Sequence, residues 1–256
     1  MYVGAAAAVW LFAEIGPAAV TWLRQLGAAV VLLAVCRPGA ATLRGRNLAL
    51  AATFGLVTAL MNLAFYESIA RIPLGTAVAL EFAGPVVLAA LGSRTARDVS
   101  ALMLVAAGVL LIADVRWTDS TLGVVFALSA AALWAVYIVL SKRVATAGVG
   151  LDALAVGFAV ATVAFVPLAV RTGPVWASPR LLALGIGVGV LATAIPYALD
   201  QVVLRRGVER ARFAVLQALL PVTAALTGLV LLGQVPTWPE ALGILAVVAG
   251  VALRSK

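Results

Sequence analysis

Three charged side chains lie inside long apolar runs, where a charge is costly. Glu81 occurs in "VALEFAGP", Asp200 in "IPYALDQ" and Arg24 in "TWLRQL". An Arg or Asp at the centre of a bilayer costs about 2.5–3.5 kcal/mol on insertion scales, so such residues usually face a bundle interior or an aqueous cavity. One cation and two carboxylates can bind a zwitterion, with its carboxylate on Arg24 and its ammonium on Glu81 or Asp200. The alternatives are a structural ion pair and snorkelling to the interface.

Polar and aromatic residues recur at helical spacing near these charges. Thr58, Asn62 and Tyr66 stand at i, i+4 and i+8, and Tyr197 precedes Asp200 by three residues, so each set shares one helix face. Trp134, Tyr137 and Ser141 repeat the pattern. We predict a cavity lined, besides the three charges, by Asn62, Tyr66, Trp134, Tyr137, Tyr197 and Gln217. Interhelical hydrogen bonds and an aromatic belt would give the same pattern.

The carboxyl groups are also the candidates for proton coupling. A carboxyl removed from water binds a proton more readily, so Glu81 or Asp200 could exchange protons with a gradient. The chain has no histidine and one cysteine, Cys36. That composition excludes His-ligated metals, His proton relays and an internal disulfide. We therefore predict no metal site and no cofactor.

Three prolines, Pro85, Pro196 and Pro221, interrupt apolar runs. Each lacks a backbone N–H and leaves a carbonyl without its helical donor. In transporters such breaks mark gating helices or backbone that coordinates ions. A tolerated kink is the alternative.

The composition requires a bilayer as solvent. Hydrophobic residues make up 64% of the chain and charged residues 11%, and the mean hydropathy is +1.15. An ordinary globular domain is about 25% charged and about 45–50% apolar. The net charge of +8 does not indicate nucleic acid, because the basic residues stand singly or in small groups between apolar runs.

The apolar runs predict an all-α integral membrane protein with ten transmembrane helices. Most runs are close to the ~20 residues that span a hydrocarbon core. The first is shorter, and it does not resemble a cleaved signal peptide because no Lys or Arg precedes it. The runs are 2–13, 18–36, 48–70, 74–92, 99–115, 121–141, 151–170, 181–204, 211–233 and 238–253.

Basic residues sort to one side of this topology. One side collects Arg37, Arg44, Arg46, Arg94, Arg97, Lys142, Arg143, Arg205, Arg206, Arg210, Arg212, Arg254 and Lys256. The other collects Arg71, Arg116, Arg171 and Arg180, and Arg24 lies within a run. Because cytoplasmic loops carry the excess of Lys and Arg, we expect a multi-pass protein of the inner (plasma) membrane with both termini in the cytoplasm.

The chain repeats itself weakly. "ALEFAGPVVLAAL" at 79–91 aligns with "VLQALLPVTAALT" at 215–227, which pairs Glu81 with Gln217 and Pro85 with Pro221. We predict two five-helix repeats, residues 1–116 and 117–256. A tandem copy of a five-span unit must insert upside down, and inverted repeats are a recurring transporter architecture.

Three stretches resemble the EamA-type drug/metabolite transporters, most closely the threonine/homoserine exporters. They are "YESIARIPLGTAVALEFAGPVVLAAL" (66–91), "LWAVYIVLSKR" (133–143) and "ATAIPYALDQVVL" (192–204). The resemblance implies two inverted five-helix repeats and proton-driven efflux of small amino acids from the bacterial cytoplasm. Two departures are a shorter N-terminus and Asp200, where similar exporters have Glu after "PYSL".

The functional hypothesis is secondary active export of a small amino acid by alternating access. The expected partners are the lipid bilayer, a small-molecule substrate and the proton, and the oligomeric state, a homodimer included, is left open. The nearest alternative is the same fold exporting drugs or other metabolites. An intramembrane enzyme is disfavoured because HExxH, GxSxG and histidine are all absent. A non-transporting scaffold has no reason to carry charges within its spans.

Overall fold

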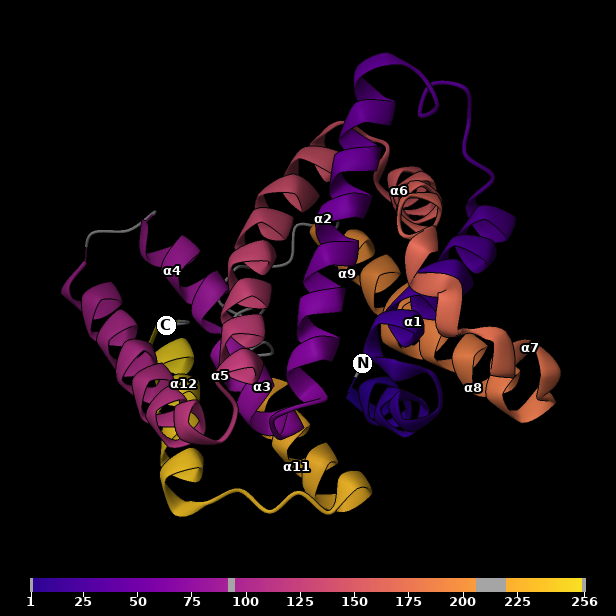
Figure 1. The fold of residues 1–256 in the computed structure, drawn as a ribbon. Helices are drawn as coiled ribbons and strands as arrows, with labels where there is room; N and C mark the ends of the chain where they lie inside the picture. Colours follow the sequence, from indigo (N-terminus) through magenta and orange to yellow (C-terminus); the bar gives the residue numbers. More distant parts are fainter. Residues whose placement is uncertain (1, 92–94, 206–219, 255–256) are drawn as a thin grey trace. The chain divides into compact units, whose positions relative to one another are not determined.

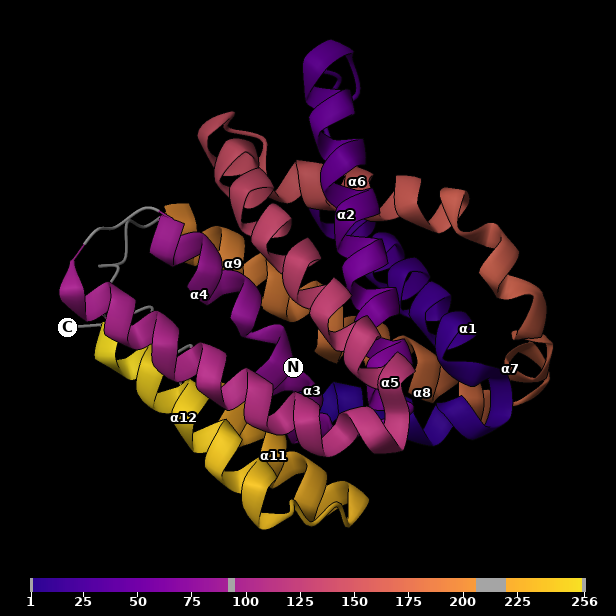
Figure 2. The same ribbon diagram turned by 60° about the vertical axis from the view of Figure 1, so that its left-hand side comes forward.

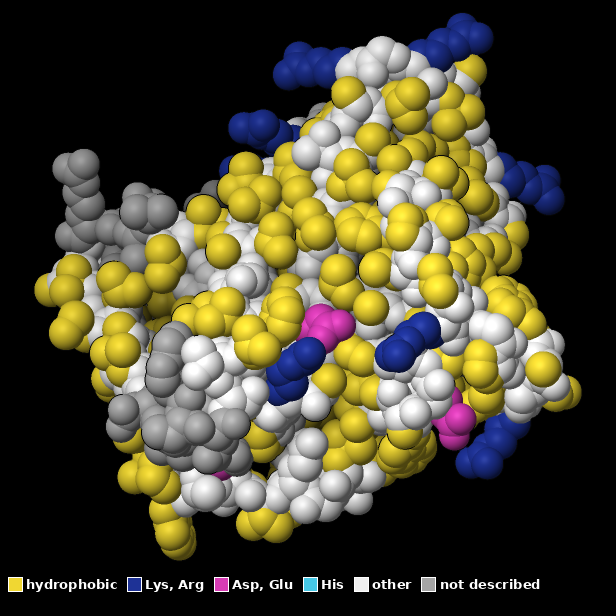
Figure 3. All heavy atoms as spheres, in the orientation of Figure 1, with side chains coloured by type: hydrophobic (Ala, Val, Ile, Leu, Met, Phe, Trp, Pro, Cys, Tyr) yellow, Lys and Arg dark blue, Asp and Glu magenta, His cyan; other side chains and the backbone are white. Residues whose placement is uncertain are grey.

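The computed structural model describes residues 2–91, 95–205 and 220–254, and within them the chain forms helices joined by short turns and loops (Figure 1). This confirms the all-α class for that part of the chain. Hydrophobic side chains are widespread on the face drawn in Figure 3, and residues such as Val170 and Trp238 are each 85% exposed. A protein dissolved in water rarely exposes so many large apolar side chains, so these side chains suit contact with lipid.

The chain packs into two compact units. The first unit comprises Met1–Tyr66 and Val136–Gly207, and the second comprises Glu67–Ala135 and Val208–Lys256. Each unit combines two separate segments of the sequence. Compact units are not sequence repeats, so the expected repeats 1–116 and 117–256 and their inverted duplication stay predictions.

The first unit is built around α1 (Tyr2–Cys36), which packs against α6 (Gly150–Ala164), α8 (Pro179–Gly189) and η2 (Val190–Ala194). It also contains most of α2 (Gly45–Ile69) and the C-terminal part of α5 (Ala96–Thr146). The remaining elements of the unit are η1 (Val166–Arg171), α7 (Gly173–Ala177) and α9 (Ile195–Arg205).

The second unit contains α3 (Leu74–Glu81), α4 (Ala83–Leu91), the first part of α5, α11 (Leu220–Leu232) and α12 (Trp238–Arg254). α3 packs against α11 and α12. α12 runs beside the first part of α5 in both ribbon views (Figures 1 and 2), and a Cβ on Gly108 of α5 would lie 2.6 Å from the Gly243 carbonyl oxygen of α12. Small residues allow this close approach.

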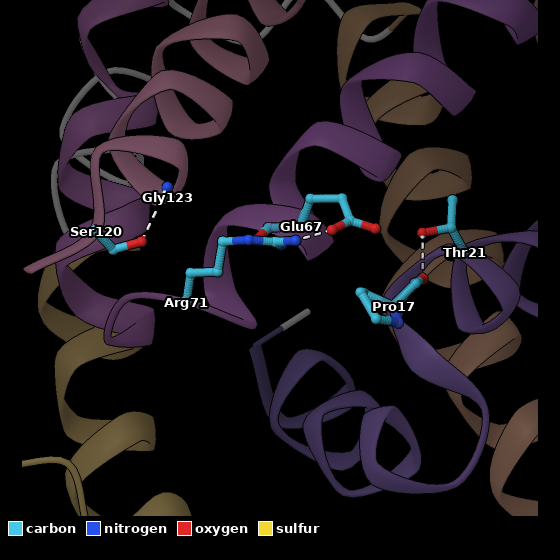
Figure 4. A network of polar contacts seen from close by, with 6 residues as sticks. All are labelled: Pro17, Thr21, Glu67, Arg71, Ser120 and Gly123. Atoms are coloured by element: carbon cyan, nitrogen blue, oxygen red, sulfur yellow. Dashed lines mark hydrogen bonds and ion pairs between the residues drawn. The ribbon is translucent and has the colours of Figure 1, made fainter.

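Two long helices change direction where the sequence separates apolar runs. Gly16 interrupts α1 with φ 79° and ψ 161°, a conformation that suits glycine, and Pro17 begins the next helical segment. Ser120 interrupts α5 with φ −155° and ψ 83°, and its Oγ accepts a hydrogen bond from the Gly123 N–H at 3.2 Å (Figure 4). A serine hydroxyl that caps a helix N-terminus in this way stabilises the new segment.

The expected break at Pro85 is also present. Pro85 has no N–H to donate to the Glu81 carbonyl, and the helix stops at Glu81 and resumes at Ala83 as α4. Pro221 lies in the first turn of α11, and the residues before Leu220 are outside the described ranges.

Four described segments are long and apolar enough to cross a membrane: Tyr2–Cys36, Gly45–Ile69, Ser120–Thr146 and Pro179–Asp200. Shorter apolar helices accompany them, and the total of ten spans stays a prediction.

Within the first unit, α2 and α6 cross at Gly55 and Gly157. A Cβ on Gly55 would overlap the Gly157 carbonyl group, and a Cβ on Gly157 would lie 2.6 Å from the Ala51 carbonyl oxygen. Backbone lies against backbone here, so no flexible side chain can yield. The crossing matters for function because α2 carries Asn62 and Tyr66.

Replacement of Gly55 by alanine should therefore destabilise the protein by about 1–3 kcal/mol, the usual cost of overpacking. The change would be measured as a lower thermal unfolding midpoint in detergent. Gly187→Ala on α8 is the matched control, because a Cβ on Gly187 meets nothing within 4 Å and alanine is the better helix former. Equal midpoints for the two variants would contradict the tight crossing.

Candidate functional site

Arg24 is buried in the first unit, with 1% of its surface exposed. Its Nε donates to Thr193 Oγ1 and its Nη2 donates to the Ala192 carbonyl oxygen at 2.8 Å. The guanidinium lies 4.9 Å from the centre of the Tyr66 ring, a cation–π arrangement. No carboxylate of a described residue lies within ion-pair distance of Arg24. The structural ion pair considered for Arg24 is thus not formed in the described part of the chain.

Pro196 explains why the Ala192 carbonyl is available to Arg24. In an α-helix the N–H of residue 196 would bond the carbonyl of residue 192, and proline has no N–H. The chain forms the π-turn η2 at this place, where the Ile195 N–H donates to the Val190 carbonyl. π-turns within α-helices are frequent at functional sites. The predicted release of a carbonyl by an in-span proline is confirmed here.

A second set of polar contacts joins α2, α5 and α9 within the first unit. Tyr197 Oη donates to Asn62 Oδ1 at 3.2 Å, and Tyr137 Oη donates to Asp200 Oδ2 at 3.4 Å. The Tyr137 and Tyr197 rings meet edge to face at 5.4 Å. Phe54 stacks on Tyr137 at 5.3 Å. Asn62, Tyr137 and Tyr197 are buried and Asp200 is half-buried, so one chain of contacts leads from the carboxylate to the α2 face that carries Asn62.

Two groups on that face have no hydrogen-bond partner among the described residues. They are Asn62 Nδ2 and Tyr66 Oη, which lie one helical turn apart. Thr58, one turn earlier, donates to the Phe54 carbonyl at 2.7 Å and is satisfied within its own helix. Buried polar groups are normally paired, so the free donors of Asn62 and Tyr66 suit a polar ligand.

A hollow of about 890 Å³ opens at one end of α2 and α5 within the first unit. It is lined by Arg46, Asn47, Ala49, Leu50, Thr53, Leu140, Arg143, Thr146 and Ala147. Phe54 directly follows the lining residue Thr53 in the sequence, and Tyr137 precedes the lining residue Leu140 by three residues. Arg46 and Arg143 make its mouth basic, which favours the approach of anionic groups.

The structure brings together six of the predicted site residues in the first unit: Arg24, Asn62, Tyr66, Tyr137, Tyr197 and Asp200. Glu81 and Trp134 belong to the second unit. Glu81 is buried at the end of α3, and Trp134 is half-buried with its ring 5.0 Å from that of Phe82, edge to face. Gln217 lies outside the described residues. Glu67, near the C-terminal end of α2, pairs with Arg71 at 2.5 Å (Figure 4).

Sequence reasoning did not find Thr193, Ala192 or the buried Glu240 of the second unit. Pro196, four residues after Ala192, indicates in the sequence that the Ala192 carbonyl lacks its helical donor. Nothing in the sequence indicates the role of Thr193. Glu240 Oε2 accepts from the Thr237 N–H and hydroxyl, both at 2.9 Å, and Glu240 Oε1 accepts from Thr76 at 2.7 Å. The sequence "TWPE" at 237–240 is a capping-box pattern that indicates this role. Glu240 thus caps the first turn of α12 and ties it to α3.

The chain is similar to known proteins in sequence and fold. The sequence model of the EamA-like transporter family matches residues 121–255. The threonine/homoserine exporter RhtA of Salmonella typhimurium is 36% identical over 251 residues, which cover 96% of this chain and 84% of that protein. RhtA of Escherichia coli strain K12 is 34% identical over the same shares. A solved crystal structure with 21% sequence identity superposes on this chain with a TM-score of 0.63. The superposition covers 98% of this chain and 95% of the solved chain, so the two have the same fold.

Proposed function

This chain belongs to the EamA-like transporter family, and we propose that it exports small amino acids of the threonine and homoserine type from the cytoplasm. It is a membrane transport protein and not an enzyme. Its exporter relatives and apolar helices point to a multi-pass protein of the inner membrane. The cytoplasmic position of both termini rests on the distribution of Lys and Arg.

The buried guanidinium of Arg24 is the observation that carries the proposal. Its described partners are one hydroxyl, one backbone carbonyl and an aromatic ring, and all three are uncharged. Guanidinium binds carboxylate through two parallel charge-assisted hydrogen bonds, which are stronger than neutral ones. A carboxylate is common to all amino acids, so Arg24 is suited to hold that end of the substrate.

The ammonium end of the substrate fits the opposite kind of group. Asp200 accepts one described hydrogen bond, from Tyr137, and an acidic oxygen can accept several more. The Tyr137 ring, which meets the Tyr197 ring edge to face, is therefore near the carboxylate, and an aromatic ring attracts a cation. We further propose Glu81, Trp134 and Gln217 as substrate residues and Glu81 with Asp200 as proton carriers, on the sequence arguments given above.

Alternating access by inverted repeats is part of the proposal. The boundaries of the compact units fall after Tyr66 and after Gly207, 141 residues apart. This interval is close to the 136 residues that separate Pro85 from Pro221 in the aligned stretches. The near agreement supports a duplicated unit whose two copies contribute equivalent segments to each compact body.

Transport into sealed vesicles tests the function. Purified protein would be reconstituted and offered labelled threonine and homoserine outside vesicles with an acidic lumen. We expect accumulation above that of protein-free vesicles, which collapses when a protonophore removes the gradient. Accumulation of drugs or other metabolites without threonine or homoserine would favour the same fold with another cargo. Vesicles that accumulate none of these compounds would contradict the proposal.

Substitution of Pro196 by alanine should slow transport about tenfold while the protein stays folded. Alanine restores an N–H that can bond the Ala192 carbonyl, and Arg24 then competes for its acceptor. Loss of one charge-assisted hydrogen bond corresponds to about 1.5–3 kcal/mol. The initial rate and the thermal unfolding midpoint would be measured together. An unchanged rate would show that the position of Arg24 does not depend on the π-turn.

A further inference from the structure

Gln25 is an unusual side chain in the first unit. It is completely buried, and neither its Oε1 nor its Nε2 has a hydrogen-bond partner among the described residues. Burying an amide without hydrogen-bond partners costs free energy at both its oxygen and its nitrogen. Native proteins seldom leave a whole amide unpaired, so Gln25 calls for an explanation beyond packing.

The position of Gln25 on α1 places it toward the interior of the first unit. Successive residues of an α-helix are rotated by about 100°, so Gln25 lies about 100° from Arg24 and about 60° from Trp22. Arg24 faces η2 and Tyr66 of α2. The Trp22 indole donates to the Thr162 carbonyl of α6 at 2.9 Å. Gln25 therefore points into the sector between the Arg24 contacts and α6.

Aromatic and polar side chains from α6, α9 and α2 are linked to one another in the same unit. The Phe158 ring of α6 meets the Tyr197 ring at 5.7 Å, and Tyr197 bonds Asn62. The unpartnered Asn62 Nδ2 and Tyr66 Oη belong to this group. Gln25, which points toward α6, carries a further unpartnered acceptor, Oε1, and a further unpartnered donor, Nε2.

The chemistry of an amide limits what Gln25 can recognise. Its Oε1 accepts and its Nε2 donates, side by side. A substrate carboxylate can only accept and an ammonium can only donate, so neither satisfies both atoms. A hydroxyl both donates and accepts and is the smallest group that matches the amide.

From this match we infer that Gln25 binds the side chain of the transported amino acid and selects for one that carries a hydroxyl. The inference rests on the proposed function, and it assigns Gln25 a different task from Arg24. Arg24 holds the carboxylate that every amino acid has, whereas Gln25 distinguishes threonine from valine, in which a methyl group replaces the hydroxyl. A site with buried polar groups rejects the analogue that leaves them unpaired.

The test compares initial transport rates of labelled threonine and labelled valine, each well below saturation, in the unsubstituted protein and in Gln25→Met. Methionine is close to glutamine in length and has no comparable donor or acceptor. We expect the unsubstituted protein to prefer threonine, and Gln25→Met to lower the threonine-to-valine ratio at least tenfold while the valine rate is maintained or rises. Gln25→Asn, which keeps a shorter amide, should give an intermediate ratio.

Gln234→Met is the matched control. Gln234 also carries an amide, but its Oε1 accepts from the Leu74 N–H at 2.9 Å in the second unit. We expect the ratio to stay unchanged in that variant. An unchanged ratio in Gln25→Met, or an equal fall of both rates with a lower unfolding midpoint, would overturn the inference. Failure of the unsubstituted protein to transport threonine would instead contradict the proposed function, and the inference with it.

Discussion

Replacement of Arg24 by methionine is expected to lower the initial rate of threonine transport about 100-fold or more. The variant removes the cation that we assign to the substrate carboxylate. Truncation of one partner in a buried charged pair costs about 2–5 kcal/mol, and every 1.4 kcal/mol corresponds to about a factor of ten. The rate would be measured in reconstituted vesicles at a threonine concentration well below saturation.

Two further variants separate this role from a structural one. Arg24→Lys keeps the positive charge but replaces the planar guanidinium by a single ammonium group, which cannot bond the Ala192 carbonyl and the Thr193 hydroxyl in the same way. We therefore expect an intermediate rate. Arg180→Met removes an exposed cation at the start of α8 and should leave the rate unchanged. Arg24→Met at the unsubstituted rate, or with rate and unfolding midpoint falling together, would contradict the carboxylate site.

Replacement of Asp200 by asparagine is expected to abolish accumulation driven by a pH gradient, while threonine exchange between the two sides continues at a reduced rate because asparagine keeps an acceptor for the ammonium but not its charge. Asparagine keeps the size of the side chain but cannot carry a proton between the two solutions. One pH unit stores about 1.4 kcal/mol, so one proton per substrate supports about tenfold accumulation, and the variant should show none. Accumulation and counterflow of labelled threonine would be measured in the same vesicles.

Asp152→Asn is the matched control for Asp200. Asp152 is a half-buried carboxylate of the same unit, in the first turn of α6, and Thr42 lies 3.5 Å from its Oδ2. We expect normal accumulation in that variant. Glu81→Gln should weaken coupling if both carboxyls share the proton. A double variant, Glu81→Gln with Asp200→Asn, that exports at the unsubstituted rate and pH dependence would exclude both as proton carriers.

The spacing of Asn62 and Tyr66 predicted a shared face on one helix, and both side chains are buried on α2. Thr58 belongs to the same face by spacing, yet its hydroxyl bonds its own helix. Spacing gives the direction in which a side chain leaves the helix axis, but the neighbouring helices decide what it meets. For the same reason the sequence did not identify Gln25 as a site residue. A neutral amide in an apolar run is a weaker indication of a functional site than a charged group.

The sequence by itself determined that this is a helical membrane protein with charges set in its interior. Hydrocarbon offers no partners to backbone N–H and carbonyl groups, so long apolar runs must form helices that satisfy their own hydrogen bonds. The sequence also located the breaks at Pro85 and Pro196, and the gap between the runs 2–13 and 18–36 contains Gly16 and Pro17, since glycine and proline change the backbone locally.

Only the tertiary structure decided which side chains meet. Arg24 bonds Thr193, 169 residues away, and Asn62 bonds Tyr197, 135 residues away. Such contacts depend on the rotation and depth of each helix against its neighbours, which the packing of small residues such as Gly27 against Gly189 sets. A single helix contains no information about that rotation, because its own hydrogen bonds are the same whichever way it faces.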